Sequence, residues 1–162
     1  MHLYIMRHGI AFEPSEWQGT DTTRPLTEKG KKRTRQVLDA LLREKKLHVD
    51  TLWSSPLVRA WQTAEIAGDA LGLKPKQIDE LACGASLRSM QKILSALKTS
   101  PERLMCVGHE PDCGIIIGQL CGDPETDYAL KKAGIAYLEG SYKPGGMKLK
   151  WLLAPRDVLK DE

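Results

Sequence analysis

The sequence predicts an α/β domain: a three-layer sandwich in which a mainly parallel central sheet is flanked by helices, with an antiparallel C-terminal hairpin. Three observations predict this class. Short apolar runs typical of buried strands alternate with longer amphipathic segments typical of helices. The last two strand-like runs are separated only by the turn Pro144-Gly145-Gly146. The length of 162 residues, 41% of them hydrophobic, is enough for a real core, and we expect a single domain over residues 1–162.

The first half of the chain contains two strand–helix pairs. We expect, in order, a strand at 2–8, a loop at 10–25, a helix at 27–46, a strand at 49–53 and a helix at 56–72. Thr27 is a typical residue before a helix, and Val37, Leu38 and Leu41 follow it at helical spacing. The second helix is expected to begin at Pro56 with Ser55 as its cap and to end at Gly72. The loop is long for a segment without structure of its own, which is typical of functional loops.

The second half continues the alternation and ends in the hairpin. We expect a short extended segment at 77–81, a helix at 86–98, a strand at 103–107, an apolar helix around 115–120, and strands at 135–142 and 148–153. Strands that alternate with helices are typical of parallel pairing, whereas a tight turn can join only antiparallel strands.

Positive charge is concentrated in one segment. The whole chain has 24 basic and 21 acidic residues, a net charge of +3, which does not indicate a nucleic-acid or membrane partner. Residues 24–46 contain nine basic and three acidic residues, a net +6, so the rest of the chain carries −3. Two interpretations stay open: a docking surface for an acidic or phosphorylated partner, or a solvated helix face.

The cysteines and histidines do not indicate a metal site or disulfides. The four cysteines form no CxxC pair, and the histidines lack metal-ligand spacing, so we expect reduced, mostly buried thiols and no metal or cofactor. The apolar run Leu3–Met6 is too short for a signal peptide, and no apolar stretch is long enough to span a membrane. We expect a soluble, cytoplasmic monomer.

Unusual residues follow three of the predicted strands. They are Arg7-His8-Gly9, then Ser54-Ser55-Pro56 with Arg59, and Gly108-His109-Glu110. Ligands of open α/β sheets bind at the carboxyl ends of the strands, so two histidines and two arginines would converge there. Such a cluster suits a phosphoryl group, because arginine matches phosphate oxygens bidentately and a neutral histidine can accept the phosphoryl group itself. The Gly9 carbonyl could then hold the tautomer of His8.

Each motif alone has an ordinary structural interpretation. A histidine at a strand end is commonly a hydrogen-bonded structural residue, and the other two motifs resemble a helix start and a turn. Metal binding by His8 and His109 is a further alternative, but no carboxylate or cysteine at either motif completes a site. The equivalent positions of the three motifs favour a shared site.

The motifs resemble a known family in order and spacing. Together with Leu26-Thr27-x-x-Gly30 and Ser54-Ser55-Pro56-x-x-Arg59-Ala60-x-Gln62-Thr63-Ala64, they resemble the histidine phosphatase (phosphoglycerate mutase-like) superfamily. Within it, the Arg-His-Gly-x-Ala opening, the stretch Asp21–Thr27 and the segment Lys132-x-Gly134-Ile135-Ala136 are similar to the SixA-type phosphohistidine phosphatases. The mutases carry a hydroxyl residue and an asparagine after Arg-His-Gly and a long later insertion. This chain has Ile10-Ala11-Phe12 and no such insertion, which disfavours mutase activity.

The resemblance implies roles for particular residues. His8 would be the nucleophile, Arg7, Arg59 and His109 would form the phosphate pocket, and Arg24 would be an additional phosphate or substrate contact. The general acid is open: Asp21 is the first choice by position and Glu80 the second, and Asp21 could equally be a turn former. A phosphohistidine substrate depends less on a general acid, because its leaving group is an imidazole with an ordinary pKa of about 6.5.

The resulting expectation is a metal-independent phosphohydrolase. It would remove phosphoryl groups from a phosphohistidine-containing protein, such as a phosphorelay or phosphotransfer protein, through a phosphohistidine enzyme intermediate. The alternatives are a broad small-molecule phosphomonoesterase and a non-catalytic phosphoprotein-binding module.

Overall fold

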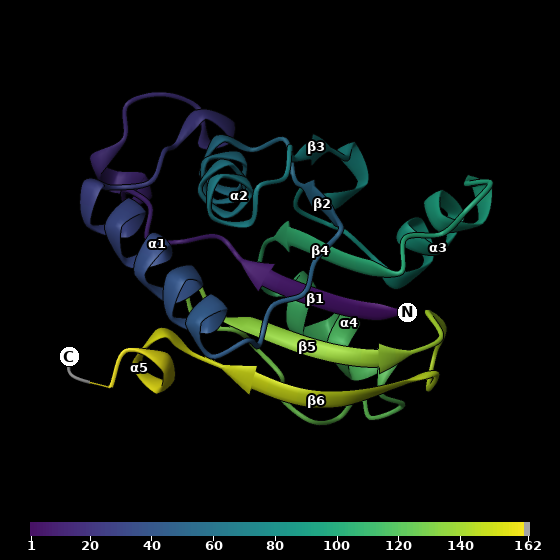
Figure 1. Ribbon diagram of the computed structural model, residues 1–162. Helices are drawn as coiled ribbons and strands as arrows, with labels where there is room; N and C mark the ends of the chain where they lie inside the picture. Colours follow the sequence, from purple (N-terminus) through teal and green to yellow (C-terminus); the bar gives the residue numbers. More distant parts are fainter. Residues whose placement is uncertain (161–162) are drawn as a thin grey trace.

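A six-stranded sheet forms the centre of the structure, a computed structural model that describes residues 1–160 (Figure 1). Its strands are β1 (His2–Arg7), β2 (Thr51–Ser54), β3 (Lys76–Gln77), β4 (Arg103–Gly108), β5 (Ile135–Gly140) and β6 (Met147–Leu153). They lie in the order β3-β2-β4-β1-β5-β6. The first four are parallel, whereas β5 runs antiparallel to β1 and β6 runs antiparallel to β5. The predicted mainly parallel sheet with an antiparallel C-terminal hairpin is confirmed.

Helices cover both faces of this sheet. The helices are α1 (Glu28–Arg43), α2 (Val58–Leu71), α3 (Leu87–Ala96), α4 (Asp112–Leu120) and α5 (Pro155–Val158), with single 3₁₀ turns at Pro14–Glu16, Asp21–Thr23 and Asp79–Leu81. Leu3 and Ile5 of β1 pack in one core with residues of α3 and α4. The alternate residues Tyr4 and Met6 pack in a second core with residues of α1 and α2. This period-two division of β1 between two cores confirms the three layers.

Side-chain chemistry sets the ends of three helices where the sequence predicted them. The Thr27 hydroxyl accepts a hydrogen bond from Gly30 N at 2.9 Å and caps α1, and Ser86 caps α3 in the same way. Helix α2 ends at Gly72, whose φ of 72° lies in the left-handed region that glycine adopts without strain.

Two other expectations were wrong in detail, and one helix was missed. Helix α2 begins at Val58 rather than Pro56, and its N-cap is Leu57, because the Ser55 side chain is used elsewhere. The segment predicted as extended at 77–81 turns into a 3₁₀ helix after β3. Helix α5 was not predicted at all.

The cysteines are all free thiols, as expected. Cys106 and Cys113 are buried, and burial raises the pKa of Cys106 to about 12. Cys121 is half-buried and Cys83 is exposed, so the expectation of mostly buried cysteines holds for only half of them. Within residues 1–160, no helix has the length and apolarity needed to cross a membrane.

Candidate active site

Backbone pairing brings the three predicted strand ends together. Arg7 of β1 is in register with Gly108 of β4, so His8 and His109 each follow directly after paired residues. The His8 amide extends the pairing by donating to Gly108 O at 3.1 Å, and the Ser55 amide donates to Val107 O at 3.0 Å. Because β4 lies between β1 and β2, it joins both neighbours at the same edge. The rings of His8 and His109 lie with their centroids 5.4 Å apart.

The surroundings of His8 fix both its tautomer and its charge. Its Nδ1 lies 2.7 Å from Gly9 O, and because a carbonyl can only accept, Nδ1 carries the ring proton. The pKa of His8 is lowered to about 3, chiefly by burial and further by electrostatic interaction with His109, Arg59 and Arg7, while the Gly9 hydrogen bond acts in the opposite direction. His8 is therefore neutral at pH 7, and its Nε2 carries a lone pair.

His109 is held by a serine from the neighbouring strand end. Its Nε2 lies 2.7 Å from Ser55 Oγ, which also accepts a hydrogen bond from Leu57 N at 3.2 Å. The Ser55 hydroxyl therefore holds the His109 ring in place from its Nε2 side. The pKa of His109 is lowered to about 4, mainly by burial and then by the charge of Arg59.

Several buried nitrogens of this cluster have no hydrogen-bond partner. Among the described residues, four buried side-chain polar atoms lack a hydrogen bond, and three of them are Arg7 Nε, Arg59 Nε and His109 Nδ1. Buried polar groups are rarely left unpaired in folded proteins. Two unpaired arginine donors and an unpaired imidazole nitrogen on three neighbouring residues fit a site that receives an anionic ligand with acceptor oxygens. The fourth atom is Thr34 Oγ1, which belongs to α1.

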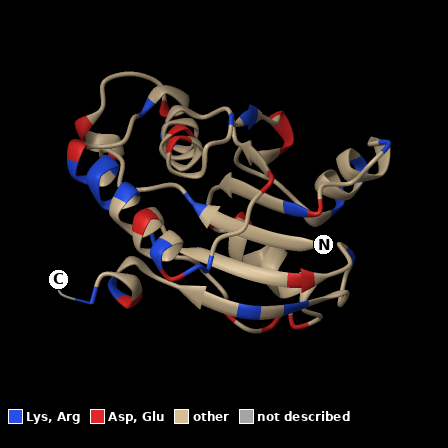
Figure 2. Cartoon of the chain, in the orientation of Figure 1, with Lys and Arg blue, Asp and Glu red and all other residues tan. Residues whose placement is uncertain are grey.

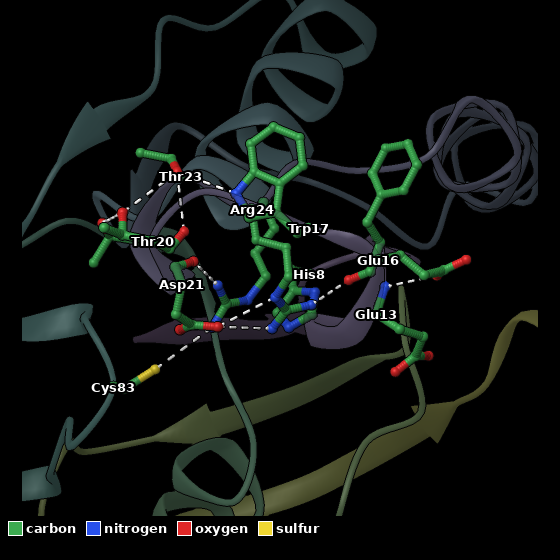
Figure 3. Close-up of polar contacts among 12 residues, drawn as sticks. His8, Glu13, Glu16, Trp17, Thr20, Asp21, Thr23, Arg24 and Cys83 are labelled. Carbon is green, nitrogen blue, oxygen red and sulfur yellow. Dashed lines mark hydrogen bonds and ion pairs between the residues drawn. The ribbon is translucent and has the colours of Figure 1, made fainter.

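The guanidinium groups of Arg59 and Arg24 hold the long loop, residues 10–25, against the site. Arg59 Nη1 donates to Asp21 O at 2.8 Å, and its Nη2 contacts Asp21 Oδ2 at 3.2 Å. Arg24 contacts the same carboxylate and donates to Phe12 O at 2.6 Å (Figure 3). Arg7 Nη1 donates to Leu130 O at 3.1 Å.

The two candidate acids differ in position. Burial acts to raise the pKa of Asp21, but its contacts with Arg59 and Arg24 outweigh burial and lower that pKa. Asp21 is therefore a carboxylate at neutral pH, which is the wrong state for donating a proton from the ligand-free protein. Glu80 lies exposed in the 3₁₀ turn after β3.

Sequence reasoning missed two supporting residues and one neighbour. Thr63 Oγ1 accepts from Gly9 N at 3.0 Å and donates to Arg59 O at 2.8 Å. It therefore links the segment after His8 to the first turn of α2, which carries Arg59. Its spacing of four from Arg59 places both on one side of α2 and could have indicated this role. Ser55 was assigned to a helix cap instead of to His109. Cys83, whose Sγ lies 3.8 Å from Arg59 Nη2, has no signal in the sequence.

Metal binding by the two histidines gains no support. Across residues 1–160, no group of three or more His, Cys, Asp or Glu side chains is arranged to hold a metal ion. The cluster instead has the composition of an oxyanion site.

The fold and this cluster place the chain in the histidine phosphatase superfamily. A family model described as the histidine phosphatase superfamily (branch 1) matches residues 3–82, and the chain belongs to that superfamily. The matched region contains His8, Arg7 and Arg59.

The similar proteins include phosphohistidine phosphatases. An uncharacterized protein of Picosynechococcus is 40% identical over 83% of this chain and 82% of its own. The phosphohistidine phosphatase SixA of Escherichia coli is 27% identical over 96% of this chain and 94% of its own. A solved structure of the protein histidine phosphatase SixA complexed with tungstate has a TM-score of 0.78 and 27% identity, covering 96% of this chain and 97% of that one.

Proposed function

We propose that this protein is a protein phosphohistidine phosphatase that forms a phosphohistidine intermediate on His8. The observation that carries the proposal is the state of His8: buried, neutral, and bound through its Nδ1 proton to Gly9 O at 2.7 Å. That arrangement leaves the Nε2 lone pair as the nucleophile. Similarity to SixA supports phosphohistidine as the substrate. Tungstate, which a SixA structure contains, is a tetrahedral oxyanion like phosphate.

The reaction proceeds in two displacements. His8 Nε2 attacks phosphorus in line, a new N–P bond forms, and the bond from phosphorus to the substrate imidazole breaks. Arg7, Arg59 and His109 stabilise the charge on the equatorial oxygens, and Arg24 is a further contact at the edge of the pocket. Water then attacks phospho-His8, which releases inorganic phosphate and restores the neutral ring. The fixed cations supply the charge that a metal ion supplies elsewhere, so no metal is required.

The environments of the two candidate acids favour a phosphohistidine substrate over a phosphate monoester. Asp21 is ion-paired with Arg59 and Arg24, and Glu80 is exposed. An alkoxide leaving group needs strong proton donation, whereas an imidazole, with a pKa of about 6.5, is protonated readily even from water. A site without a strong proton donor should therefore cleave the N–P bond of phosphohistidine faster than the O–P bond of a phosphate monoester.

The decisive experiment traps the intermediate. Native protein and His8→Ala are incubated with a peptide that carries a radiolabelled phosphohistidine, and the protein is then separated under alkaline conditions. We expect an acid-labile, base-stable label on the native protein and none on His8→Ala. Hydrolysis of the peptide by His8→Ala at the native rate would contradict the mechanism. Faster turnover of phosphoserine than of phosphohistidine would favour the phosphomonoesterase alternative.

Metal independence gives a second test. Activity on the phosphohistidine peptide is measured before and after dialysis against EDTA. We expect the rate to be unchanged, because the charge on the phosphoryl oxygens is met by arginine and histidine side chains. A loss that is restored by adding a divalent cation would contradict this part of the proposal.

A further inference from the structure

A second concentration of positive charge adjoins the candidate active site. A pocket of about 350 Å³ is lined by five basic residues and three others: Arg7, Arg33, Lys131, Lys132 and Arg156, with Ile10, Ala154 and Pro155. Within residues 1–160, none of the residues that line it is a carboxylate. We refer to it as the basic pocket. It gathers five of the chain's 24 basic residues in one place.

The basic pocket is assembled from four separate parts of the chain. Arg7 ends β1, Arg33 belongs to α1, Lys131 and Lys132 precede β5, and Arg156 belongs to α5. In Figure 2, basic residues lie on both α1 and α5, at the left of the view. Helix α5 packs beside α1, which explains how a C-terminal arginine reaches the surface next to β1. The cluster therefore cannot be seen in the sequence, because its residues are not close together along the chain.

Among the described residues, the acids nearest Lys132 and Arg156 neutralise these two side chains only weakly. Lys132 Nζ lies 3.8 Å from Glu13 Oε1, at the outer limit of an ion pair. Asp157 is next to Arg156, but its Oδ2 accepts from Ala154 N at 2.8 Å and so serves the start of α5. Lys131 and Arg156 are exposed. Like charges held together in a concave site attract anions from solution.

Two other basic residues of the run 24–46 pair with acids on the protein's own surface. Lys31 pairs with Glu28 at 3.3 Å, and Arg35 pairs with Asp39 and Asp69 at 3.0 and 2.8 Å. Those side chains fit the interpretation of a solvated, internally paired helix face.

We propose that the basic pocket binds the carboxylates of an acidic segment of the phosphoprotein substrate. This inference rests on the proposed function and names the feature that would select its partner. Arg7 belongs to both the basic pocket and the candidate active site, so a segment in the pocket would lie beside the phosphoryl group at His8. The volume exceeds that of one oxyanion, and the exposed, flexible Lys131 and Arg156 suit several carboxylates spaced along an extended chain.

The test measures binding separately from hydrolysis. A fluorescein-labelled peptide with one histidine among glutamates is compared by anisotropy at low salt with the same peptide carrying glutamines. The charge-reversed variant Lys131→Glu/Arg156→Glu is compared with Lys92→Glu/Lys98→Glu, which makes the same change in charge at exposed positions on and just after α3. We expect the Kd for the glutamate peptide to rise about tenfold in the first variant and less than about twofold in the second.

The possible outcomes separate the two proposals. Three outcomes would overturn the basic pocket as a docking site. They are an equal rise in Kd in both variants, no rise in either variant, and equally tight binding of the glutamine peptide. The histidine-phosphorylated form of the glutamate peptide is then offered to native protein. If it binds at the basic pocket but is not hydrolysed, the proposed function fails while the docking site stands. If it is hydrolysed while Kd is insensitive to Lys131→Glu/Arg156→Glu, only the docking site fails.

Discussion

At the scale of single residues, His8 and His109 link the stability of the protein to pH. The pKa of His8 is lowered to about 3 and that of His109 to about 4, in both cases chiefly by burial. In the unfolded chain both would protonate near pH 6.5. The unfolded state therefore binds more protons below that pH, and stability that is complete above about pH 6.5 is lost as the pH falls toward 4. The slope is at most about 1.4 kcal/mol per pH unit for each histidine.

Urea unfolding over this pH range checks the linkage. We expect the double variant His8→Asn/His109→Asn to show a flatter dependence of the free energy of unfolding than native protein between about pH 6.5 and 4. His48→Asn, at an exposed histidine, is the matched control. Parallel curves for native protein and the double variant would rule out these histidines as the source.

Thr63 is a positioning residue that the site requires. Its hydroxyl joins Gly9 N to Arg59 O, so Thr63→Val leaves a buried amide without an acceptor, at a cost of about 1–3 kcal/mol in stability. We also expect kcat on the phosphohistidine peptide to fall about tenfold with KM little changed, because the His8 and Arg59 segments lose their register. Thr63→Ser keeps the hydroxyl and should restore most of the rate. A Thr63→Val variant with native kcat would show that Thr63 is structural only.

We expect Asp21 to compete with a bound phosphoryl group for Arg59. Its carboxylate contacts Arg59 Nη2 at 3.2 Å and Arg24 Nη2 at 3.1 Å in the ligand-free protein. In Asp21→Asn these charges are released, so we expect inorganic phosphate to inhibit with a Ki about threefold to tenfold lower. Thr22→Ala, at the next position of the same turn, should leave Ki unchanged. An unchanged or higher Ki in Asp21→Asn would mean that Asp21 does not occupy the anion's place.

At the scale of elements, Gly30 determines how closely α1 approaches the loop after His8. A Cβ at this position would lie 2.0 Å from Ile10 O, a backbone atom that cannot move without shifting Gly9 and His8. We expect Gly30→Ala to lower the free energy of unfolding by about 1–3 kcal/mol, as overpacking does. Lys29→Ala, on the exposed side of the same turn, should stay within about 0.5 kcal/mol of native protein. Denaturant titration distinguishes these outcomes, and a stable Gly30→Ala would contradict the close packing.

Elements were predictable from sequence where a side chain defines them. Thr27 and Gly72 mark ends of α1 and α2 because a hydroxyl cap and a left-handed glycine are local chemistry. The start of α2 was misplaced because Leu57 caps it through the backbone alone, while Ser55 turns to a residue 54 positions later. Helix α5 has four residues, too few for any periodicity. Its position depends on packing against α1.

At the scale of the whole molecule, the sequence was enough to predict that the side chains of the site cluster, but not how they contact their neighbours. Equivalent strand ends were enough to group His8, His109 and Arg59, because parallel strands present their carboxyl ends at one edge. The partners that tune them could not be predicted. The Asp21–Arg59 pair and the Cys83 contact depend on how loops fold over the edge, and loops follow no periodicity. The basic pocket was hidden for the same reason, since its members come from four parts of the chain.

The position of β4 between β1 and β2 has a consequence for synthesis. Arg7, His8 and Arg59 are made first, but their strands are not neighbours until residues 103–108 fill the space between them. A chain emerging from the ribosome would thus carry most of its reactive groups for many residues without bringing them together. His109, which completes the cluster, follows immediately after the strand that joins the other two. The cluster would then come together in one step, once residues 103–109 have been made and β4 has paired with both of its neighbours.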